Sequence, residues 1–235
     1  MRGTYEKKTI LWIIVCVVMI AGILVLLANT LDLPALDFLR FRKEKVAATV
    51  NGQQIYWSTV NERVENINLI YEAGIECTEN SDLSDEKKQE TIQQMQNRPT
   101  QSRDEILDSL IRNTVAYQQA EKDGLVPSYE EAYEANEQNY QLAKTYAEDS
   151  NYANEDTILA YEILKAYMKA KHWNEKEYLE QTAYEYQINM AVGNLYNKFK
   201  ESYADEADEN KIRAAYEDYL DILVEEADIQ YFDME

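Results

Sequence analysis

An uncharged apolar stretch of 19 residues, from Ile10 to Ala28, constrains the fold of this chain more than any other feature. A helix needs about 20 apolar residues to cross the hydrocarbon core of a bilayer. A cleavable signal peptide has a shorter apolar stretch, about 7–15 residues, which ends in small residues. The candidate cleavage point after Ala28 has Leu26 two places before it. We therefore expect residues 10–28 to form an uncleaved transmembrane signal anchor, preceded by a cytoplasmic tail of residues 1–9.

Charges on the two sides of this stretch do not decide its orientation. Arg2, Lys7 and Lys8 precede it, and four further cations follow it at Arg40, Arg42, Lys43 and Lys45. The positive-inside rule counts both groups. The juxtamembrane linker, residues 29–45, also mixes apolar side chains with its cations. Two interpretations of it stay open: a segment that lies along the membrane surface, or a simple connection.

The remainder of the chain is strongly acidic. Residues 46–235 contain 16 Lys or Arg and 40 Asp or Glu, a net charge of −24. Nucleic-acid phosphates repel such a surface, so we expect no nucleic-acid binding. Cys16 lies in the apolar stretch and Cys77 beyond it, which argues against a disulfide framework. A single histidine, His172, excludes a histidine-rich metal site.

Two short segments alternate between polar and apolar residues, as strands do. Residues 46–55 have Asn51-Gly52 at their centre, a strong signal for the turn of a β-hairpin. Residues 227–233 alternate in the same way near the end of the chain. We expect the hairpin, residues 47–57, to pair with residues 228–232.

Helical periodicity dominates between these segments. It predicts helices over about 59–74, 102–124, 128–150, 156–171, 174–203 and 209–226. Capping boxes mark four of the starts: Thr59 with Glu62, Ser102 with Glu105, Ser128 with Glu131, and Asn174 with Glu177. Gly74 and Gly124 are expected to end two of the helices. Residues 76–100 are polar and are predicted to be an insertion or a mobile loop, with a weak helix around 86–96.

Several short motifs occur in an order that matches a known family. Residues 48–55 contain A-x-V-N-G-x-x-I, and residues 106–125 contain a helix with L-D-x-L-I that closes on A-x-x-x-G. Segments 128–131, 175–179 and 210–216 follow in the expected order. The whole of residues 46–233 resembles the N-terminal domain of SurA/PrsA-type chaperones. The resemblance implies a mainly α-helical domain over residues 46–235 with a small β element.

Two departures from the family pattern shape the functional expectation. A parvulin-type prolyl isomerase domain usually follows in this family, whereas this sequence ends at Glu235, where that domain would begin. The 76–100 insertion is also longer than the resemblance leads us to expect. The resemblance thus implies a holding chaperone without the isomerase. It would be a single-pass protein of the cell membrane with its domain on the extracytoplasmic face.

No motif in the chain indicates an enzyme. P-loop, G-x-S-x-G, H-E-x-x-H and C-x-x-C patterns are absent from the sequence. No pair of carboxylates stands out among the many acidic residues. His172 follows a predicted helix, where a cation interacts favourably with the helix dipole. We expect no enzymatic activity, no cofactor and no bound metal.

The 19 tyrosines suggest how such a domain would bind its partners. Tyrosine joins a broad apolar ring to a polar tip, which suits contact with varied peptides, and methionine adds adaptable apolar contact. We hypothesise an open groove in residues 128–203 that holds unfolded or secreted polypeptides. The candidate lining residues are Tyr133, Tyr140, Tyr161, Tyr167, Met168, Tyr186 and Met190.

Two alternatives to this hypothesis stay open. These tyrosines and methionines also fall at helical spacing, which favours ordinary packing between helices. At the level of function, the alternative is a bitopic structural or assembly subunit whose helical domain docks one fixed partner in a membrane or cell-envelope complex. Such a subunit would have much the same sequence.

Overall fold

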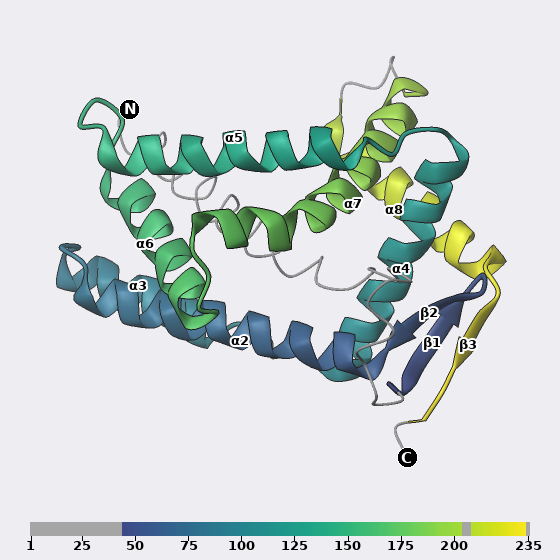
Figure 1. Ribbon diagram of the computed structural model, residues 1–235, viewed down its shortest axis with the longest axis horizontal. Helices are drawn as coiled ribbons and strands as arrows, with labels where there is room; N and C mark the ends of the chain where they lie inside the picture. The colour runs from purple at the N-terminus through teal and green to yellow at the C-terminus, as the bar shows by residue number, and fades with distance from the viewer. Residues whose placement is uncertain (1–43, 204–207, 234–235) are drawn as a thin grey trace.

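The computed structural model describes residues 44–203 and 208–233. Seven helices and a three-stranded sheet make up this part of the chain (Figure 1). In order they are β1 (Val46–Val50), β2 (Gln53–Tyr56), α2 (Trp57–Asn80), α3 (Asp85–Gln96), α4 (Arg103–Lys122), α5 (Tyr129–Glu148), α6 (Glu155–Ala170), α7 (Glu175–Glu201), α8 (Glu209–Glu226) and β3 (Ile229–Tyr231). The expected mainly α-helical fold with a small β element is confirmed.

The predicted membrane anchor, residues 10–28, lies outside the described residues, as do the tail 1–9 and nearly all of the linker 29–45. Within residues 44–203 and 208–233, no helix combines the length and the apolar character that crossing a bilayer requires.

The β-hairpin forms as predicted and pairs with the C-terminal strand. Asn51 and Gly52 adopt positive φ values of 50° and 87°, which the tight turn between β1 and β2 requires. The strand order is β2-β1-β3, and both pairs are antiparallel. Asn51 also fixes the other end of the chain, because its backbone N–H donates to Asp228 O at 2.8 Å.

Helix α2 differs from the prediction at both of its ends. Thr59 with Glu62 does not cap it: the helix begins at Trp57, and Thr59 lies buried inside it. Gly74 does not end it either, since the helix continues for six more residues to Asn80. A side chain at Gly74 would place its Cβ 3.0 Å from Met95 Sδ. The glycine therefore permits close approach of α3 rather than terminating the helix.

The polar segment 76–100 is more ordered than predicted. Residues 76–80 belong to α2, and α3 confirms the predicted weak helix around 86–96, so most of the segment is helical; the interpretation as an insertion stays a prediction. Besides the Met95 contact, Lys87 donates to Glu155 at 3.0 Å and lies 2.9 Å from Asp156. The guanidinium of Arg98 lies 4.0 Å from the centre of the Tyr71 ring. These contacts tie α3 to α2 and α6 despite its polar sequence.

The remaining helix boundaries agree with the sequence. Capping boxes are present at Ser102, Ser128 and Asn174, as predicted. Gly124 ends α4 with a φ of 67°, and His172 does the same after α6 with a φ of 57°. His172 thus lies at a helix end as expected, in a backbone conformation that usually favours glycine.

The helices close into a ring. Helix α2 packs on α6, α6 on α5, α5 on α7, α7 on α4, and α4 again on α2. Figure 1 shows this ring with α2 and α5 on opposite sides and α6 and α4 at the two ends. Helix α8 and the sheet lie outside the ring against α4.

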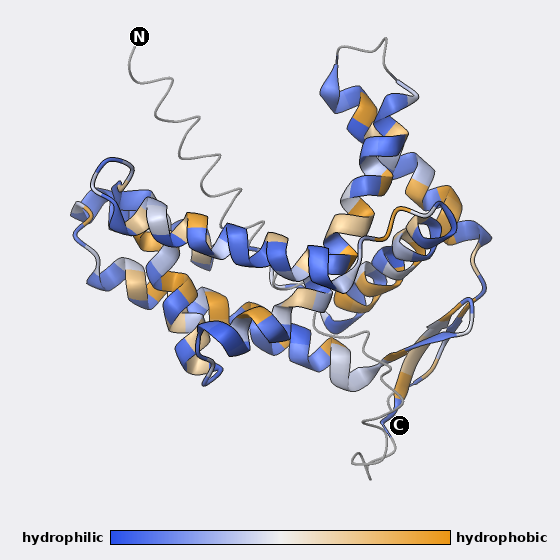
Figure 2. Ribbon diagram, turned by 45° about the horizontal axis from the view of Figure 1, so that its top comes forward, coloured by the Kyte–Doolittle hydropathy of each residue, from blue (hydrophilic) through white to orange (hydrophobic). Residues whose placement is uncertain are grey.

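Apolar packing is divided among three clusters around this ring. One joins α5, α6, the second half of α2 and the start of α7, and it includes Tyr140 and Tyr167. A second joins the sheet, α2, α4 and α8 around Val50 and Ile106. A third joins α4, α7 and α8 around Leu195. Figure 2 shows the same distribution, with hydrophobic residues on the inner sides of the helices and hydrophilic residues outside.

Candidate polypeptide-binding surface

Four of the seven candidate groove residues are enclosed in the first apolar cluster. Tyr140, Tyr161, Tyr167 and Met168 are between 2% and 7% exposed. The rings of Tyr140 and Tyr161 lie 6.3 Å apart, and burial raises the pKa of the Tyr140 and Tyr167 hydroxyls. These contacts are those of helix packing, the alternative interpretation for these residues. Whether any of the four contacts a polypeptide stays untested.

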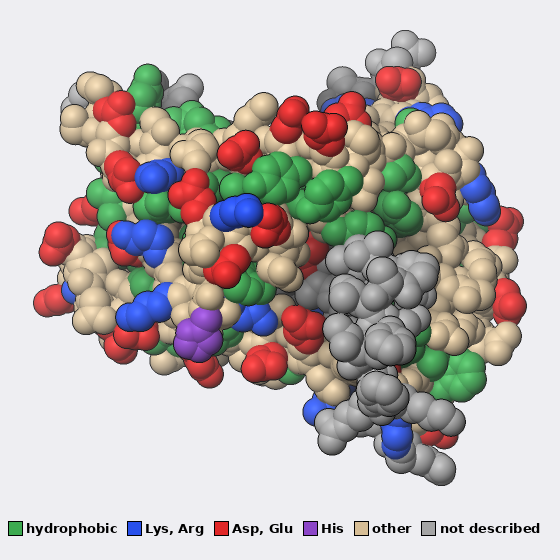
Figure 3. Space-filling view, in the orientation of Figure 1, with side chains coloured by type: hydrophobic (Ala, Val, Ile, Leu, Met, Phe, Trp, Pro, Cys, Tyr) green, Lys and Arg blue, Asp and Glu red, His purple; other side chains and the backbone are tan. Residues whose placement is uncertain are grey.

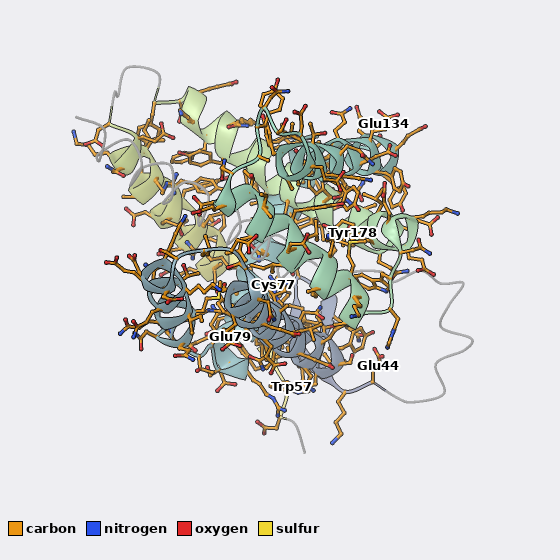
Figure 4. The ribbon with its side chains drawn as sticks, turned by 90° about the vertical axis from the view of Figure 1, so that its left-hand side faces the viewer. Glu44, Trp57, Cys77, Glu79, Glu134 and Tyr178 are labelled. Atoms are coloured by element: carbon orange, nitrogen blue, oxygen red, sulfur yellow. The ribbon has the colours of Figure 1, made fainter. Side chains whose placement is uncertain are left out.

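The other three candidates, Tyr133 of α5 and Tyr186 and Met190 of α7, are half-buried. Tyr133 of α5 packs against the first cluster and lies 6.5 Å, ring to ring, from exposed Tyr129. Tyr186 and Met190 lie one turn apart on α7. In Figure 4, Tyr178 of α7 lies toward the middle of the molecule and Glu134 of α5 at its outer edge.

An apolar and aromatic surface runs along α5 and reaches α7 through the polar side chain of Asn139, which contacts Tyr186. The Tyr186 hydroxyl contacts the amide of Asn139 on α5, and Leu142 and Tyr146 follow on the same side of that helix. The Tyr146 ring then lies 5.6 Å from that of Tyr152, edge to face, in the turn after α5. We call this surface the α5–α7 stripe; its members are Tyr152, Tyr146, Leu142, Tyr186 and Met190.

The outer part of the stripe is well exposed. Leu142 is 47%, Tyr146 40% and Tyr152 56% exposed, high values for apolar and aromatic side chains that lie next to one another. Single exposed apolar residues are ordinary on protein surfaces, whereas contiguous ones indicate a site of interaction.

Local hydrogen bonds hold the two helices of the stripe in place. Between α5 and α7, Asn136 donates to Thr182 at 2.7 Å and Gln141 to Glu175 at 2.7 Å. In the turn, Asp149 accepts from the backbone N–H of Asn151 at 2.9 Å. These bonds fix α5 against α7 and shape the turn that carries Tyr152.

Acidic residues surround this apolar surface. Glu148, the last residue of α5, and Asp149 follow Tyr146, and Glu148 is exposed. Figure 3 shows acidic side chains spread over the visible face, around a band of hydrophobic side chains. A partner that carries both apolar and basic residues would match this surface.

Sequence reasoning included Tyr186 and Met190 but missed the exposed part of the stripe. The sequence of α5 did contain a pattern that predicts an exposed apolar side. The helix carries apolar residues on two sides, Tyr133 with Tyr140 and Leu142 with Tyr146. One neighbouring helix layer covers only one side, so the second set was a candidate for exposure.

The arrangement offers contact surface rather than chemistry. Within residues 44–203 and 208–233, no group of three His, Cys, Asp or Glu side chains is placed to hold a metal ion. The stripe itself contains tyrosine rings, a leucine and a methionine, side chains suited to apolar contact.

Comparison with known families assigns the chain. The SurA-like N-terminal domain matches residues 4–157, about two thirds of the sequence, so the chain belongs to this family. The match runs from the N-terminal segment through α5 to the start of α6, and it includes the hairpin and the L-D-x-L-I helix. Membership indicates a chaperone-type role and confirms the resemblance seen in the sequence. No curated protein and no solved structure matches the chain.

Proposed function

We propose that this protein is a membrane-anchored holding chaperone that binds unfolded or secreted polypeptides on the α5–α7 stripe. The observation that carries the proposal is the contiguous exposure of Leu142, Tyr146 and Tyr152 on a domain of the SurA-like family. Weak apolar contacts are non-directional and tolerate many sequences, as a holding chaperone requires. No catalytic step is part of the proposal.

The anchor belongs to the same proposal. Residues 10–28 would fix the domain to the cell membrane, with the amino terminus in the cytoplasm and the domain on the extracytoplasmic face. Anchoring would raise the effective concentration of the stripe where polypeptides emerge. Protease added to intact protoplasts should digest residues 46–235, whereas full protection would reverse the topology.

The stripe is tested by replacing Tyr146 and Tyr152 with serine in the same chain. Both side chains are largely exposed, so we expect the free energy of unfolding to change by less than about 1 kcal/mol. We expect suppression of aggregation of an unfolded model client to fall severalfold. Light scattering of the client with the parent or the variant measures this effect.

Two control variants make the result specific. Ile222 of α8 is 53% exposed and lies outside the stripe, so Ile222→Ser should protect the client as the parent does. Tyr140→Ser with Tyr167→Ser removes enclosed side chains and should cost about 3 kcal/mol or more per site. Full protection by the Tyr146→Ser/Tyr152→Ser variant would show that the stripe is not the client site.

Crosslinking in membranes separates this function from that of an assembly subunit. A holding chaperone should be recovered with many different polypeptides in small amounts. Recovery of one partner in a fixed ratio would instead identify a docking subunit of an envelope complex.

A further inference from the structure

The ring of helices has a polar centre, formed by Arg63 and Asn66 of α2 and by Glu185 and Asn189 of α7. Arg63, Asn66 and Glu185 are 3%, 2% and 5% exposed. About one turn separates the two residues on each helix, so each pair lies on one face. Arg63 and Glu185 interact electrostatically, which places the two faces opposite each other.

Each of these four side chains has an atom without a hydrogen-bond partner. Two are donors, Arg63 Nη1 and Asn189 Nδ2, and two are acceptors, Asn66 Oδ1 and Glu185 Oε1. Buried polar groups are satisfied in the great majority of cases in folded proteins. Burial also raises the pKa of Glu185 well above its usual value and lowers that of Arg63, so both charged forms are poorly solvated here. The centre therefore offers unfilled donors and acceptors on facing helices.

We propose that this polar centre binds the main chain of an extended polypeptide segment. The inference rests on the proposed function for the source of that segment, and it adds a second site with a different chemistry. The stripe would contact side chains, whereas the centre would contact backbone amides.

The chemistry of the centre favours a neutral amide ligand. Arg63 and Glu185 face each other and attract, so a ligand with net charge would have to compete with one of them for its partner. A peptide backbone carries one N–H donor and one C=O acceptor at nearly every residue, matching the two orphan donors and two orphan acceptors. Such recognition is independent of the side chains, which suits a domain that holds varied clients.

A weak contact borders the centre and marks where the ring would open. Lys171, just after α6, lies 3.9 Å from Glu62 of α2, a long distance for an ion pair. Both Glu62 and Lys171 act electrostatically on Glu185, so this contact lies beside the centre. The apolar clusters lie on either side of the centre, toward α6 and toward α4. Local separation of α7 from α2 at this border would admit a segment.

A peptide with uncharged ends and small side chains tests the proposal on the full chain in detergent solution. The probe is acetyl-Gly-Ala-Gly-Ala-Gly-Ala-amide, and the signals are the side-chain amide resonances of Asn66 and Asn189. We expect both resonances to shift in a saturable way in the parent. The Tyr146→Ser/Tyr152→Ser variant should bind the probe with an unchanged dissociation constant, which separates this site from the stripe.

Variants of the centre complete the test. Arg63→Met with Glu185→Leu should weaken binding at least tenfold, whereas Arg112→Met with Glu217→Leu removes an exposed ion pair and should leave binding unchanged. If the first variant does not fold, Asn66→Leu replaces it, with the same expected loss read from the Asn189 resonance. Absence of saturable shifts in the parent, or undiminished binding by the folded centre variant, would assign the four residues a structural role only.

Discussion

Glu185 and Arg63 are the residues at which charge and burial conflict most strongly in this domain. Burial is the main reason that the pKa of Glu185 lies well above its usual value, and Arg63 opposes the shift only in part. A carboxyl group with a raised pKa binds more protons in the folded state than in the unfolded state. The free energy of unfolding then decreases as pH rises above the unfolded pKa of about 4.3.

Glu185→Gln removes this titration and makes the effect measurable. We expect the free energy of unfolding of the variant, relative to the parent, to increase as pH rises from about 4.5 to about 8. Glu62, Lys171 and Tyr167 also face Glu185, but they are unchanged in the variant. Chemical denaturation at several pH values gives the difference. A constant offset across this range would mean that Glu185 titrates normally.

Tyr140 and Tyr146 show how far sequence reasoning reaches at the scale of a residue. Both are tyrosines of α5 and fall on apolar positions of the helical pattern. Tyr140 is 6% exposed and Tyr146 is 40% exposed. Helical periodicity shows that the two side chains point to different sides of α5. Only the placement of α6 and α7 decides which of these sides is covered. The sequence therefore selected helices that carry tyrosine and methionine, but it could not separate the enclosed side chains from the exposed ones.

Helix starts show the same limit at the scale of an element. Ser102, Ser128 and Asn174 follow the capping-box pattern and form the predicted caps. Thr59 follows the same pattern, yet it lies inside α2, because the helix begins directly after β2 and its first residue, Trp57, donates its N–H to Lys45 O at 2.9 Å. The hairpin determines where α2 begins, and this tertiary constraint is not contained in a four-residue motif.

Aspartate substitutions distinguish the two kinds of position. Aspartate caps a helix about as well as serine, so Ser128→Asp should change the free energy of unfolding by less than about 0.5 kcal/mol. Thr59 is 4% exposed, so Thr59→Asp buries a charge and should cost about 3 kcal/mol or more. Thermal and chemical denaturation of both variants measure the contrast. Equal tolerance at the two positions would restore Thr59 as a cap.

Gly74 and α3 show what local pattern cannot predict. A glycine late in an amphipathic helix usually indicates an end, and a polar segment usually indicates a loop. Here the missing Cβ lets Met95 approach, and α3 is held by its contacts with α2 and α6. The predicted end of α2 at Gly74 and the predicted loop after it both failed for one reason. Helix α3 is stabilised by contacts with helices that its own polar sequence does not reveal.

The ring of helices is a property of the whole molecule. Pairing of the hairpin with β3 joins residues about 180 positions apart, and alternation together with the family resemblance predicted it. The polar centre was not predicted, since Arg63 and Glu185 lie on different helices and no local pattern relates them. Composition indicated a helical acidic domain, but the arrangement of three apolar clusters around a polar centre required the tertiary structure.

Net charge gives the prediction that belongs to this largest scale. Residues 46–235 carry a net charge of −24, and acidic residues surround the exposed stripe. Such a field attracts a basic polypeptide and speeds its encounter with the domain, an effect that salt screens over about 10 Å at 0.1 M and about 3 Å at 1 M. We expect the association rate constant of a basic unfolded client to fall at least tenfold between low and high salt.

A client with the same apolar positions but glutamate in place of lysine is the matched control. Repulsion should make it associate slowly at low salt and faster as salt increases, because screening then removes an unfavourable field rather than a favourable one. Stopped-flow measurement of both clients over one series of salt concentrations yields two slopes of opposite sign. Equal slopes would show that apolar contact alone governs encounter, and that the acidic surface serves solubility without selecting clients.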